Sequence, residues 1–244
     1  MRFCKILLIS LILVLPKSLF GIAGFGLNVI SDGTKLGAYT STETDATTGV
    51  TATVESFEME KLPVGGGGYI FVDIGDWAVE AEANITAGEF SFNFGNDLTD
   101  ASGNNLTEPL NYPFAWGRLS TAVTVKKNIT DFSIPVLAET ALSVGLGINN
   151  HISTPRPSME MVKGLLGTGE TITGAVDTDK LEDELIDYLM DNTIKSSGFH
   201  AQLGLRFRLL VLDTHLTLRY NLAEDVYDGS SGFAELQLKV GTAF

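Results

Sequence analysis

The amino-acid sequence predicts an all-β protein that folds as an up-and-down antiparallel β-barrel of eight strands and crosses a membrane. Three observations lead to this prediction. The chain begins with a segment of secretory type, its apolar residues recur at every second position in eight separate segments, and the connections between these segments alternate between long and short. Alternation of this kind is typical of strands that have one apolar and one polar face.

The N-terminal segment has the three parts of a secretory signal peptide. An arginine and a lysine give it a positive start, residues 6–15 are apolar apart from one serine, and small residues precede the expected cleavage after Ala23. The apolar run is shorter than the roughly 20 residues that a membrane-spanning helix needs, so a signal peptide is favoured over an N-terminal anchor. We therefore expect a signal peptide at 1–23 and a barrel at 24–244.

The charge of the chain narrows its partners. Removal of the three cations of the signal peptide (Arg2, Lys5 and Lys17) takes the formal net charge from −14 to −17. Binding to nucleic acid needs a basic face, so a nucleic-acid partner is excluded. The mean hydropathy of +0.19 is nevertheless high for so acidic a chain, so its apolar residues must be spread along the sequence. The only cysteine, Cys4, lies in the signal peptide, so we expect no disulfide in the mature chain.

The strands are predicted wherever apolar residues alternate with polar ones. The first strand is expected at 24–30, and the remaining seven at 70–74, 77–85, 119–125, 134–148, 199–211, 216–222 and 234–244. Four long connections are expected at about 31–64, 95–113, 150–197 and 225–232, and the short ones at Gly75-Asp76, about 127–133 and Leu212-Asp213. Outer-membrane barrels have short periplasmic turns and longer external loops, so the long connections are expected outside the cell.

The two tightest turns predict the register of their hairpins. A two-residue turn at Gly75-Asp76 places Ile74 opposite Trp77, with apolar pairs along one face. A turn at Leu212-Asp213 pairs Leu209 with Leu216 and places Arg206 opposite Arg219. That like-charge pair would be costly unless nearby carboxylates offset it.

The last strand carries a resemblance to a known group of proteins. It alternates to the end of the chain and closes on an aromatic residue, with the apolar positions at Leu236, Leu238, Val240 and Phe244. In this the chain resembles the small eight-stranded outer-membrane barrels of the OmpA and OmpW kind. The resemblance implies location in the bacterial outer membrane, contact with membrane lipid, and an assembly signal read by the barrel-insertion machinery. Thr242 departs from the usual apolar or aromatic residue. The resemblance concerns architecture and assigns no particular activity.

The polar faces of the strands should fill the interior, or lumen, of a barrel this narrow. Charged residues expected there are Glu80, Glu82, Arg118, Glu139, Arg206, Arg208, Arg219, Glu235 and Lys239. Buried charges persist when they are paired, so we expect an ion-pair network that plugs the barrel. A polar conduction path remains an alternative. A soluble lipocalin-like barrel, with the apolar faces inside, is the alternative fold.

Two segments do not follow the simple barrel pattern. Phe90, Phe92 and Phe94 occupy positions whose parity is polar before Gly88, which indicates either a β-bulge that switches the faces or an external hairpin. The third long connection predicts an amphipathic helix from Thr178 to about residue 194, and a shorter helix around residues 159–166. The apolar face of the longer helix comprises Leu181, Leu185, Ile186, Leu189 and Met190. The two helices are expected to pack on each other, and a lid or ligand surface is the alternative.

Catalysis has little support in the sequence. His151 and His200 are expected near the external ends of their strands, but no nucleophile motif accompanies them or His215. We therefore expect no enzyme, no cofactor and no metal site. The primary expectation is a structural or surface-binding barrel with acidic external loops, which could contact a small molecule or a surface protein. The alternatives are a solute channel or carrier gated by the helical loop, and a hydrolase at the rim.

Overall fold

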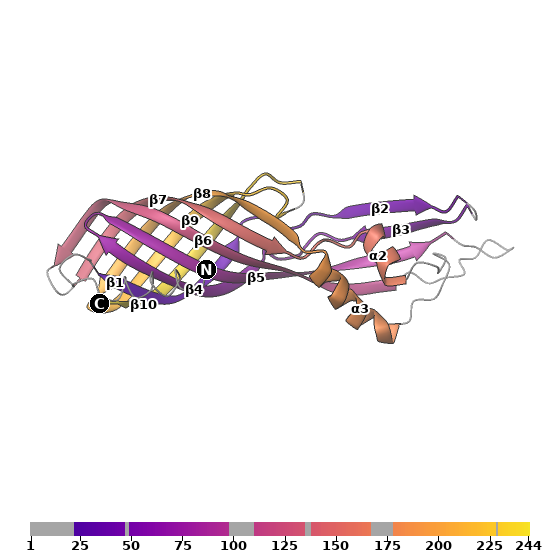
Figure 1. Cartoon of the computed structure of the whole chain (residues 1–244), viewed down its shortest axis with the longest axis horizontal. Coiled ribbons are helices and arrows are strands. Elements are labelled where there is room, and N and C mark those ends of the chain that lie inside the picture. Colours follow the sequence, from indigo (N-terminus) through magenta and orange to yellow (C-terminus); the bar gives the residue numbers. More distant parts are fainter. Residues whose placement is uncertain (1–21, 47–48, 98–109, 135–137, 167–177, 228) are drawn as a thin grey trace, which may run out of the picture.

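The computed structural model describes residues 22–46, 49–97, 110–134, 138–166, 178–227 and 229–244, and these form a closed antiparallel barrel with an extension at one end (Figure 1). Eight strands make the ring, each paired with its neighbours, and the last strand pairs with the first. The predicted fold class is therefore confirmed. In chain order these strands are β1 (Ala23–Asp32), β4 (Val64–Ile74), β5 (Trp77–Asn96), β6 (Leu110–Ile134), β7 (Ala138–Ser153), β8 (Ile194–Leu209), β9 (Leu212–Leu222) and β10 (Phe233–Ala243).

The two faces of the barrel have opposite chemistry. Large apolar side chains cover the outside, and Leu205, Leu218 and Leu238 are each about half exposed there. Charged and amide side chains fill the inside, where most are buried. The alternative of a soluble lipocalin-like barrel was therefore wrong, because such a barrel would have its apolar faces inside. No described helix is both long enough and apolar enough to cross a membrane.

The register of the first tight hairpin is as predicted. Ile74 lies opposite Trp77, and the pairing continues along β4 and β5 without a shift. The second prediction was wrong: β8 ends at Leu209, which pairs with Leu212, so the turn is Leu210-Val211. Leu210 has a φ of 55°, the left-handed conformation that a tight turn uses.

This turn lies two residues before the predicted one and changes every partner across β8 and β9. Arg206 faces His215 instead of Arg219, which in turn faces Gln202. The partners move by an even number of residues, so each side chain keeps its face. The observed register removes the like-charge pair, and it also brings Asp213 into the barrel.

The third short connection is also displaced from its predicted place. Residues 127–133 belong to β6, which runs to Ile134 with a register shift between Asn128 and Thr130. The connection to β7 lies between Ile134 and Ala138. The prediction of a turn at these residues was wrong, because they continue the strand and pair with β7.

β5 and β6 continue past the barrel and, together with two further strands, form a four-stranded extension of the same sheet (Figure 1). The predicted loop 31–64 contains a hairpin of β2 (Tyr39–Thr44) and β3 (Thr51–Ser56). β3 pairs with the distal part of β5, from Ala52 opposite Asn96 to Ser56 opposite Phe92, so the strand order is β2-β3-β5-β6. We call this four-stranded part the distal sheet.

The two helices predicted in the third long connection are present, and they lie beside the distal sheet. They are α2 (Met159–Leu166) and α3 (Thr178–Asp191). α3 ends before the predicted residue 194, because Ile194 already begins β8. Figure 1 shows both helices beside the distal sheet, at the end of the molecule away from the C-terminus.

The distal sheet has an apolar core of its own. Phe90, Phe92 and Phe94 lie within it, and β5 pairs with β6 through this region without a register shift. The bulge hypothesis was therefore wrong, and the hairpin beyond the barrel is the correct alternative. We define the distal core by its buried members: Leu36, Ala52, Val54, Met59, Phe90, Phe92, Phe94, Phe114, Trp116, Met159, Met161, Val162, Leu185, Ala223, Val226, Tyr227 and Phe233.

The apolar face predicted for α3 divides into two parts. Leu185 is buried in the distal core and Leu189 packs against it. Ile186 and Met190 are exposed. The side chain of Leu181 lies outside the described residues.

Candidate functional site

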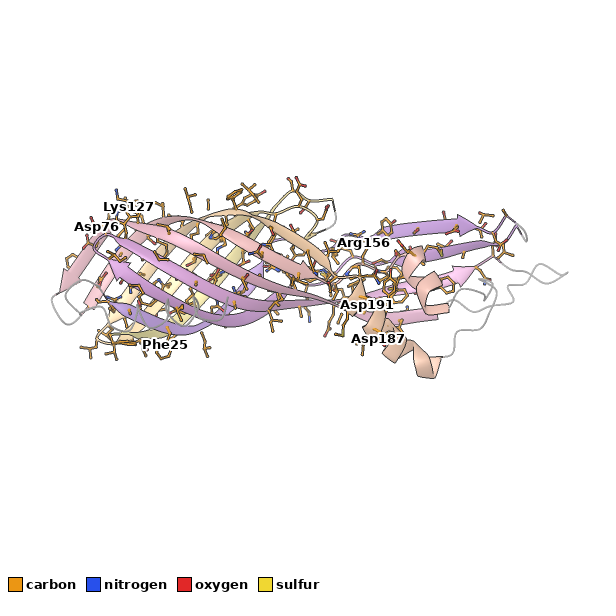
Figure 2. The ribbon with its side chains drawn as sticks, in the orientation of Figure 1. Phe25, Asp76, Lys127, Arg156, Asp187 and Asp191 are labelled. Atoms are coloured by element: carbon orange, nitrogen blue, oxygen red, sulfur yellow. The ribbon has the colours of Figure 1, made fainter. Side chains whose placement is uncertain are left out.

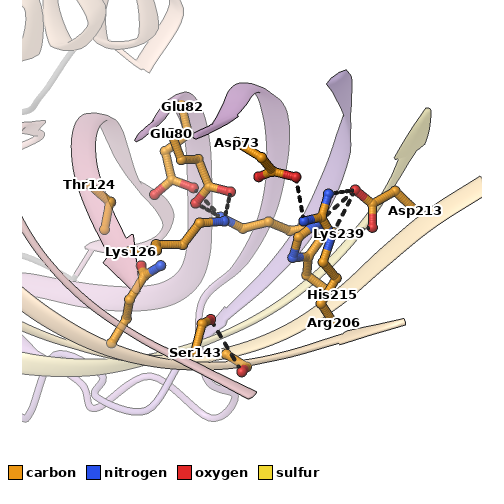
Figure 3. A network of polar contacts seen from close by, with 12 residues as sticks. Asp73, Glu80, Glu82, Thr124, Lys126, Ser143, Arg206, Asp213, His215 and Lys239 are labelled. Atoms are coloured by element: carbon orange, nitrogen blue, oxygen red, sulfur yellow. Dashed lines mark hydrogen bonds and ion pairs between the residues drawn. The ribbon is translucent and has the colours of Figure 1, made fainter. Parts of the chain in front are cut away.

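The lumen contains a cluster of charges at the short-turn end of the barrel (Figure 3). The guanidinium of Arg206 lies 2.7 Å from Asp73 and 2.6 Å from Asp213, which are carried by β4 and β9. Arg208, two residues along β8, lies 3.1 Å from Asp73 and 3.2 Å from Glu139. The imidazole of His215 is 3.3 Å from Asp213. Four strands thus contribute to this cluster at the short-turn end, which we call the lower cluster.

A second group of charges, which we call the middle cluster, lies halfway along the lumen. Lys239 is fully buried and places its Nζ 2.6 Å from Glu80 and 2.8 Å from Glu82. Lys126 donates to the other oxygen of Glu80 at 2.8 Å. Arg219 donates to Glu82 and reaches Gln202 at 2.8 Å. Each of the two glutamates therefore binds two cations.

The third group lies below the distal sheet. Arg118 donates to Asp32 at 2.9 Å and to Glu235 at 3.3 Å. Glu235 is also 3.8 Å from Arg219, which joins this group to the middle one. The hydroxyl of Tyr227, from the loop between β9 and β10, donates to Asp32. Burial, reinforced by the Asp32 carboxylate, raises the pKa of Tyr227, so its phenol stays protonated and able to donate.

Two aromatic side chains lie between the lower and middle clusters. Tyr69 and Phe71 stack with their ring centroids 6.1 Å apart. The guanidinium of Arg206 is 4.8 Å from the centre of the Phe71 ring, and the Lys239 ammonium is 5.4 Å from that of Tyr69. Cation–π contacts of this kind are favourable when the cation is desolvated. Gly26 leaves the space that the Tyr69 ring occupies, since a Cβ there would lie 2.8 Å from it.

An aromatic roof separates the charged lumen from the rest of the distal core. Tyr227 contacts Trp116, with centroids 4.8 Å apart, and Phe233, with centroids 5.2 Å apart. The guanidinium of Arg118 lies under the Phe233 ring, 4.5 Å from its centre. The loop that carries Tyr227 is thereby held by both apolar and polar contacts.

The charges in these contacts nearly balance. The cations are Arg118, Lys126, Arg206, Arg208, Arg219 and Lys239, and the carboxylates are Asp32, Asp73, Glu80, Glu82, Glu139, Asp213 and Glu235. Removal of one member of a buried ion pair strands its partner and typically costs about 3–5 kcal/mol. Each of these side chains thus depends on its neighbours.

All nine lumen charges predicted from the sequence lie in this network, and Glu139 is the most exposed of them. The prediction missed four further charged residues and one tyrosine for identifiable reasons. Asp73 and Lys126 follow the polar parity of their strands but were passed over. Asp32 lies beyond the predicted end of β1, and Asp213 was placed in a turn. Tyr227 comes from a loop, where strand periodicity gives no signal.

The three histidines lie inside the barrel. His200 is buried and 2.8 Å from the hydroxyl of Thr124, and His151 is buried edge-on to Phe233. His151 and His200 thus do not present an exposed rim site. Among the described residues, no group of three or more histidine, cysteine or acidic side chains is placed to hold a metal.

The C-terminal strand closes the barrel. β10 pairs with both β9 and β1, and the backbone of Phe244 exchanges hydrogen bonds of 2.8 and 3.0 Å with Ala23. Leu236, Leu238 and Val240 point outward, as does Phe244, whose ring meets that of Phe25 edge-on at 6.2 Å. Figure 2 shows Phe25 on the outside of the barrel.

Comparison with known proteins finds likeness in structure only. No protein-family model matches the chain, and no curated protein matches it. A structure of Ail, the attachment invasion locus protein of Yersinia pestis, in complex with the heparin analogue sucrose octasulfate is 10% identical, with a TM-score of 0.41, and the match covers 92% of this chain and 99% of Ail. Neisserial surface protein A is 13% identical over 91% of this chain and 97% of its own, with a TM-score of 0.34. The N-terminal β-barrel domain of Pseudomonas aeruginosa OprF is 12% identical over 91% and 99%, with a TM-score of 0.31.

The class of protein follows from the geometry of the chain itself. A closed barrel leaves no sheet edge unpaired in the membrane, and here its outer surface is apolar while its interior is polar. The chain is therefore an integral outer-membrane β-barrel protein of the small eight-stranded kind.

Proposed function

We propose that this protein is a non-conducting barrel that anchors a surface-exposed binding structure, the distal sheet with its helices, in the outer membrane. The ion-pair network carries the proposal. It extends from Asp73 at the short-turn end to Asp32 under the roof, and every charged group in it has a partner. A lumen filled in this way leaves the distal sheet as the part available for contact with other molecules.

The orientation follows from the two ends of the barrel. The long connections, the distal sheet and the helices all lie at one end, while the short turns and the C-terminus lie at the other (Figure 1). Small outer-membrane barrels carry long loops outside the cell and short turns in the periplasm. We infer that the distal sheet is extracellular, that the apolar belt contacts lipid, and that the C-terminal strand is presented to the insertion machinery.

The other two functions have less support. A channel gated by the helical loop would need helices that cover an open lumen, but Met161 and Leu185 pack in the distal core and Tyr227 closes the lumen below them. A rim hydrolase would need accessible histidines, and His151 and His200 are buried. His200 does lie 2.8 Å from the Thr124 hydroxyl, but both side chains are buried inside the barrel, where a substrate at the rim would not meet them.

Planar-bilayer recording tests the plug. Purified protein should show no steady conductance, and the same should hold when residues 159–191 are replaced by a short glycine-serine linker. That linker can close the gap because Ser153 and Ile194 are paired neighbours. Steady conductance in the unaltered protein would overturn the plug, and conductance that appears only after the replacement would favour the gated channel.

Cysteine labelling of whole cells tests the orientation. The chain has no cysteine beyond Cys4, so a single introduced thiol can be followed. We expect Thr42→Cys, in the distal sheet, to react with a membrane-impermeant reagent, and Asp76→Cys, in a short turn, to react only after lysis (Figure 2). The opposite pattern would invert the proposed orientation.

A further inference from the structure

The distal sheet has free strand edges, which the barrel lacks. The ring of eight strands closes on itself, but the distal sheet ends at β2 on one side and at the distal segment of β6, residues 110–116, on the other. A free edge presents unpaired backbone N–H and C=O groups and can accept a strand from another chain. Proteins commonly block such edges, so the chemistry of each edge is informative.

The β6 edge is blocked by a proline. The backbone N–H of Thr154 donates to the carbonyl of Gly117 at 2.9 Å, and the N–H of Gly117 donates to the Thr154 hydroxyl at 3.0 Å, so the backbone groups of Gly117 point away from β5. Every second residue of β6 from there directs its backbone groups to the same side. Pro113 is one of these residues, and it has no N–H to offer an incoming strand.

The outer backbone edge of β2 has no strand paired to it, although helix α2 lies close by and the guanidinium of Arg156 packs 4.8 Å from the centre of the Tyr39 ring. The N–H of Asp45 donates to the carbonyl of Val50 at 2.9 Å, in line with the register of β2 and β3. Hydrogen-bonded pairs alternate along an antiparallel ladder, so Tyr39, Ser41 and Glu43 bond to β3. The backbone groups of Thr40, Thr42 and Thr44 then point away from the sheet, and no described residue bonds to them there.

The side chains of β2 favour an added strand. Three of its six residues are threonine, a β-branched residue that suits strands, and none is proline or lysine, the residues that commonly protect an edge. Thr40, Thr42 and Thr44 are exposed. The contrast with β6 indicates that β2 is kept available for pairing.

The charge around β2 indicates what kind of strand it accepts. The cross-strand neighbour of Thr40 is the exposed Glu55, and the net charge of the chain is strongly negative. A second copy of this chain would bring more negative charge to the same place. An extended segment with lysine or arginine at alternate positions would instead place its cations on the far side of Thr40 from Glu55, roughly 10 Å away along the sheet, a distance that a long cationic side chain can largely span.

We propose that the free edge of β2 binds an extended, basic segment of a partner protein by β-strand addition. The backbone of Thr40, Thr42 and Thr44 supplies the hydrogen bonds, and Glu55 selects for positive charge. The inference depends on the proposed function only for the placement of this edge outside the cell. Binding to purified protein tests the edge alone, whereas the cysteine-labelling experiment tests the placement.

The test uses purified full-length barrel in detergent and a fluorescent eight-residue peptide that alternates lysine with threonine or valine. Fluorescence anisotropy measures its affinity. We expect Thr42→Pro, which removes one N–H from the free edge, to weaken binding at least about tenfold, and Thr42→Ala, which keeps the backbone, to change it less than about twofold. A peptide with glutamate in place of lysine should also bind at least about tenfold more weakly.

N-methylated peptides give a readout that needs no variant protein. N-methylation of the peptide amides that face β2 should abolish binding. N-methylation of the intervening amides, which face away from β2, should leave binding unchanged. Equal effects of the two methylation patterns, or equal affinities for wild type and Thr42→Pro, would overturn strand addition. A concentration-dependent dimer that Thr42→Pro dissolves would overturn the basic partner and assign the edge to a second copy.

Discussion

The two halves of β5 follow opposite rules although they belong to one uninterrupted strand. In the barrel, Glu80 and Glu82 point inward and Val79 points outward; in the distal sheet, Phe92 points inward and Ser91 points to the other face. The parity of the strand never changes. What changes is the surroundings, since the outside of the barrel is lipid and the outside of the distal sheet is water. The same backbone therefore supports an inverted core and a conventional one.

The difference has an energetic consequence. The inner side of the barrel is held by charges that cannot lose a partner cheaply, whereas the distal core is held by apolar area. Tyr227 belongs to both, because its ring packs in the distal core and its hydroxyl donates to Asp32 in the lumen. The following substitutions test whether the two parts follow different rules.

The largest effect is expected from the middle of the lumen. Lys239→Met leaves Glu80 and Glu82 short of a cation in a buried site, and should lower the free energy of unfolding by about 3–5 kcal/mol. Urea unfolding in lipid or detergent measures it. The neighbouring outward change Leu238→Met should cost less than about 1.5 kcal/mol. A cost below about 1 kcal/mol for Lys239→Met would show that water screens the network.

A change of similar size, but confined to the distal sheet, is expected for Phe92→Ala. Truncation of a buried phenylalanine costs about 3–5 kcal/mol. The distal sheet should become sensitive to protease while the barrel stays folded, which SDS gels of heated and unheated samples would test. Ser91→Ala, on the opposite face of the same strand, should stay within about 0.5 kcal/mol. Loss of the barrel along with the distal sheet would show that the two parts fold as one unit.

A third test places the same cation on the outer face of each part. Arginine near the middle of a bilayer costs about 2–4 kcal/mol, so Leu218→Arg should destabilise refolding into lipid by that amount. Thr53→Arg, on the outer face of the distal sheet, should change stability by about 0.5 kcal/mol or less. Equal costs at the two positions would contradict the assignment of one surface to lipid and the other to water.

The sequence predicts those features of the fold that follow from the alternation of apolar and polar residues. It placed all eight barrel strands and the nine charges of the lumen, because each side chain's face follows from its parity. It could not set the register of β8 on β9, because a shift that preserves parity leaves the pattern unchanged. The observed register brings Arg206 within 2.6 Å of Asp213, a contact that the alternation pattern alone does not predict.

The distal sheet was harder to predict for a physical reason. Its hairpin contains the short polar strand Tyr39–Thr44. This strand gives no apolar signal because nearly all of its side chains are exposed on both faces. The phenylalanines of β5 did mark the change of surroundings. The sequence did not decide whether these phenylalanines marked a β-bulge or a hairpin outside the barrel. That choice depends on the pairing of β5 with β6, which involves residues distant in sequence.

The smallest effect on the folded protein, and the largest separation between folding and assembly, is expected at the C-terminus. The Phe244 ring is 74% exposed on the outer face, so its contribution through lipid burial should be on the order of 1.5–3 kcal/mol. If Phe244 also completes the assembly signal, its deletion should leave the protein able to refold from urea into detergent, yet cause periplasmic accumulation or degradation in cells. Phe244→Ala keeps the two backbone hydrogen bonds to Ala23 and so separates the ring from the strand closure. Normal surface display of both variants would contradict the assembly signal. Failure of the deletion alone to refold would show that the backbone closure between β10 and β1 matters more than the aromatic ring, since that closure is what leaves the barrel without an edge in the membrane.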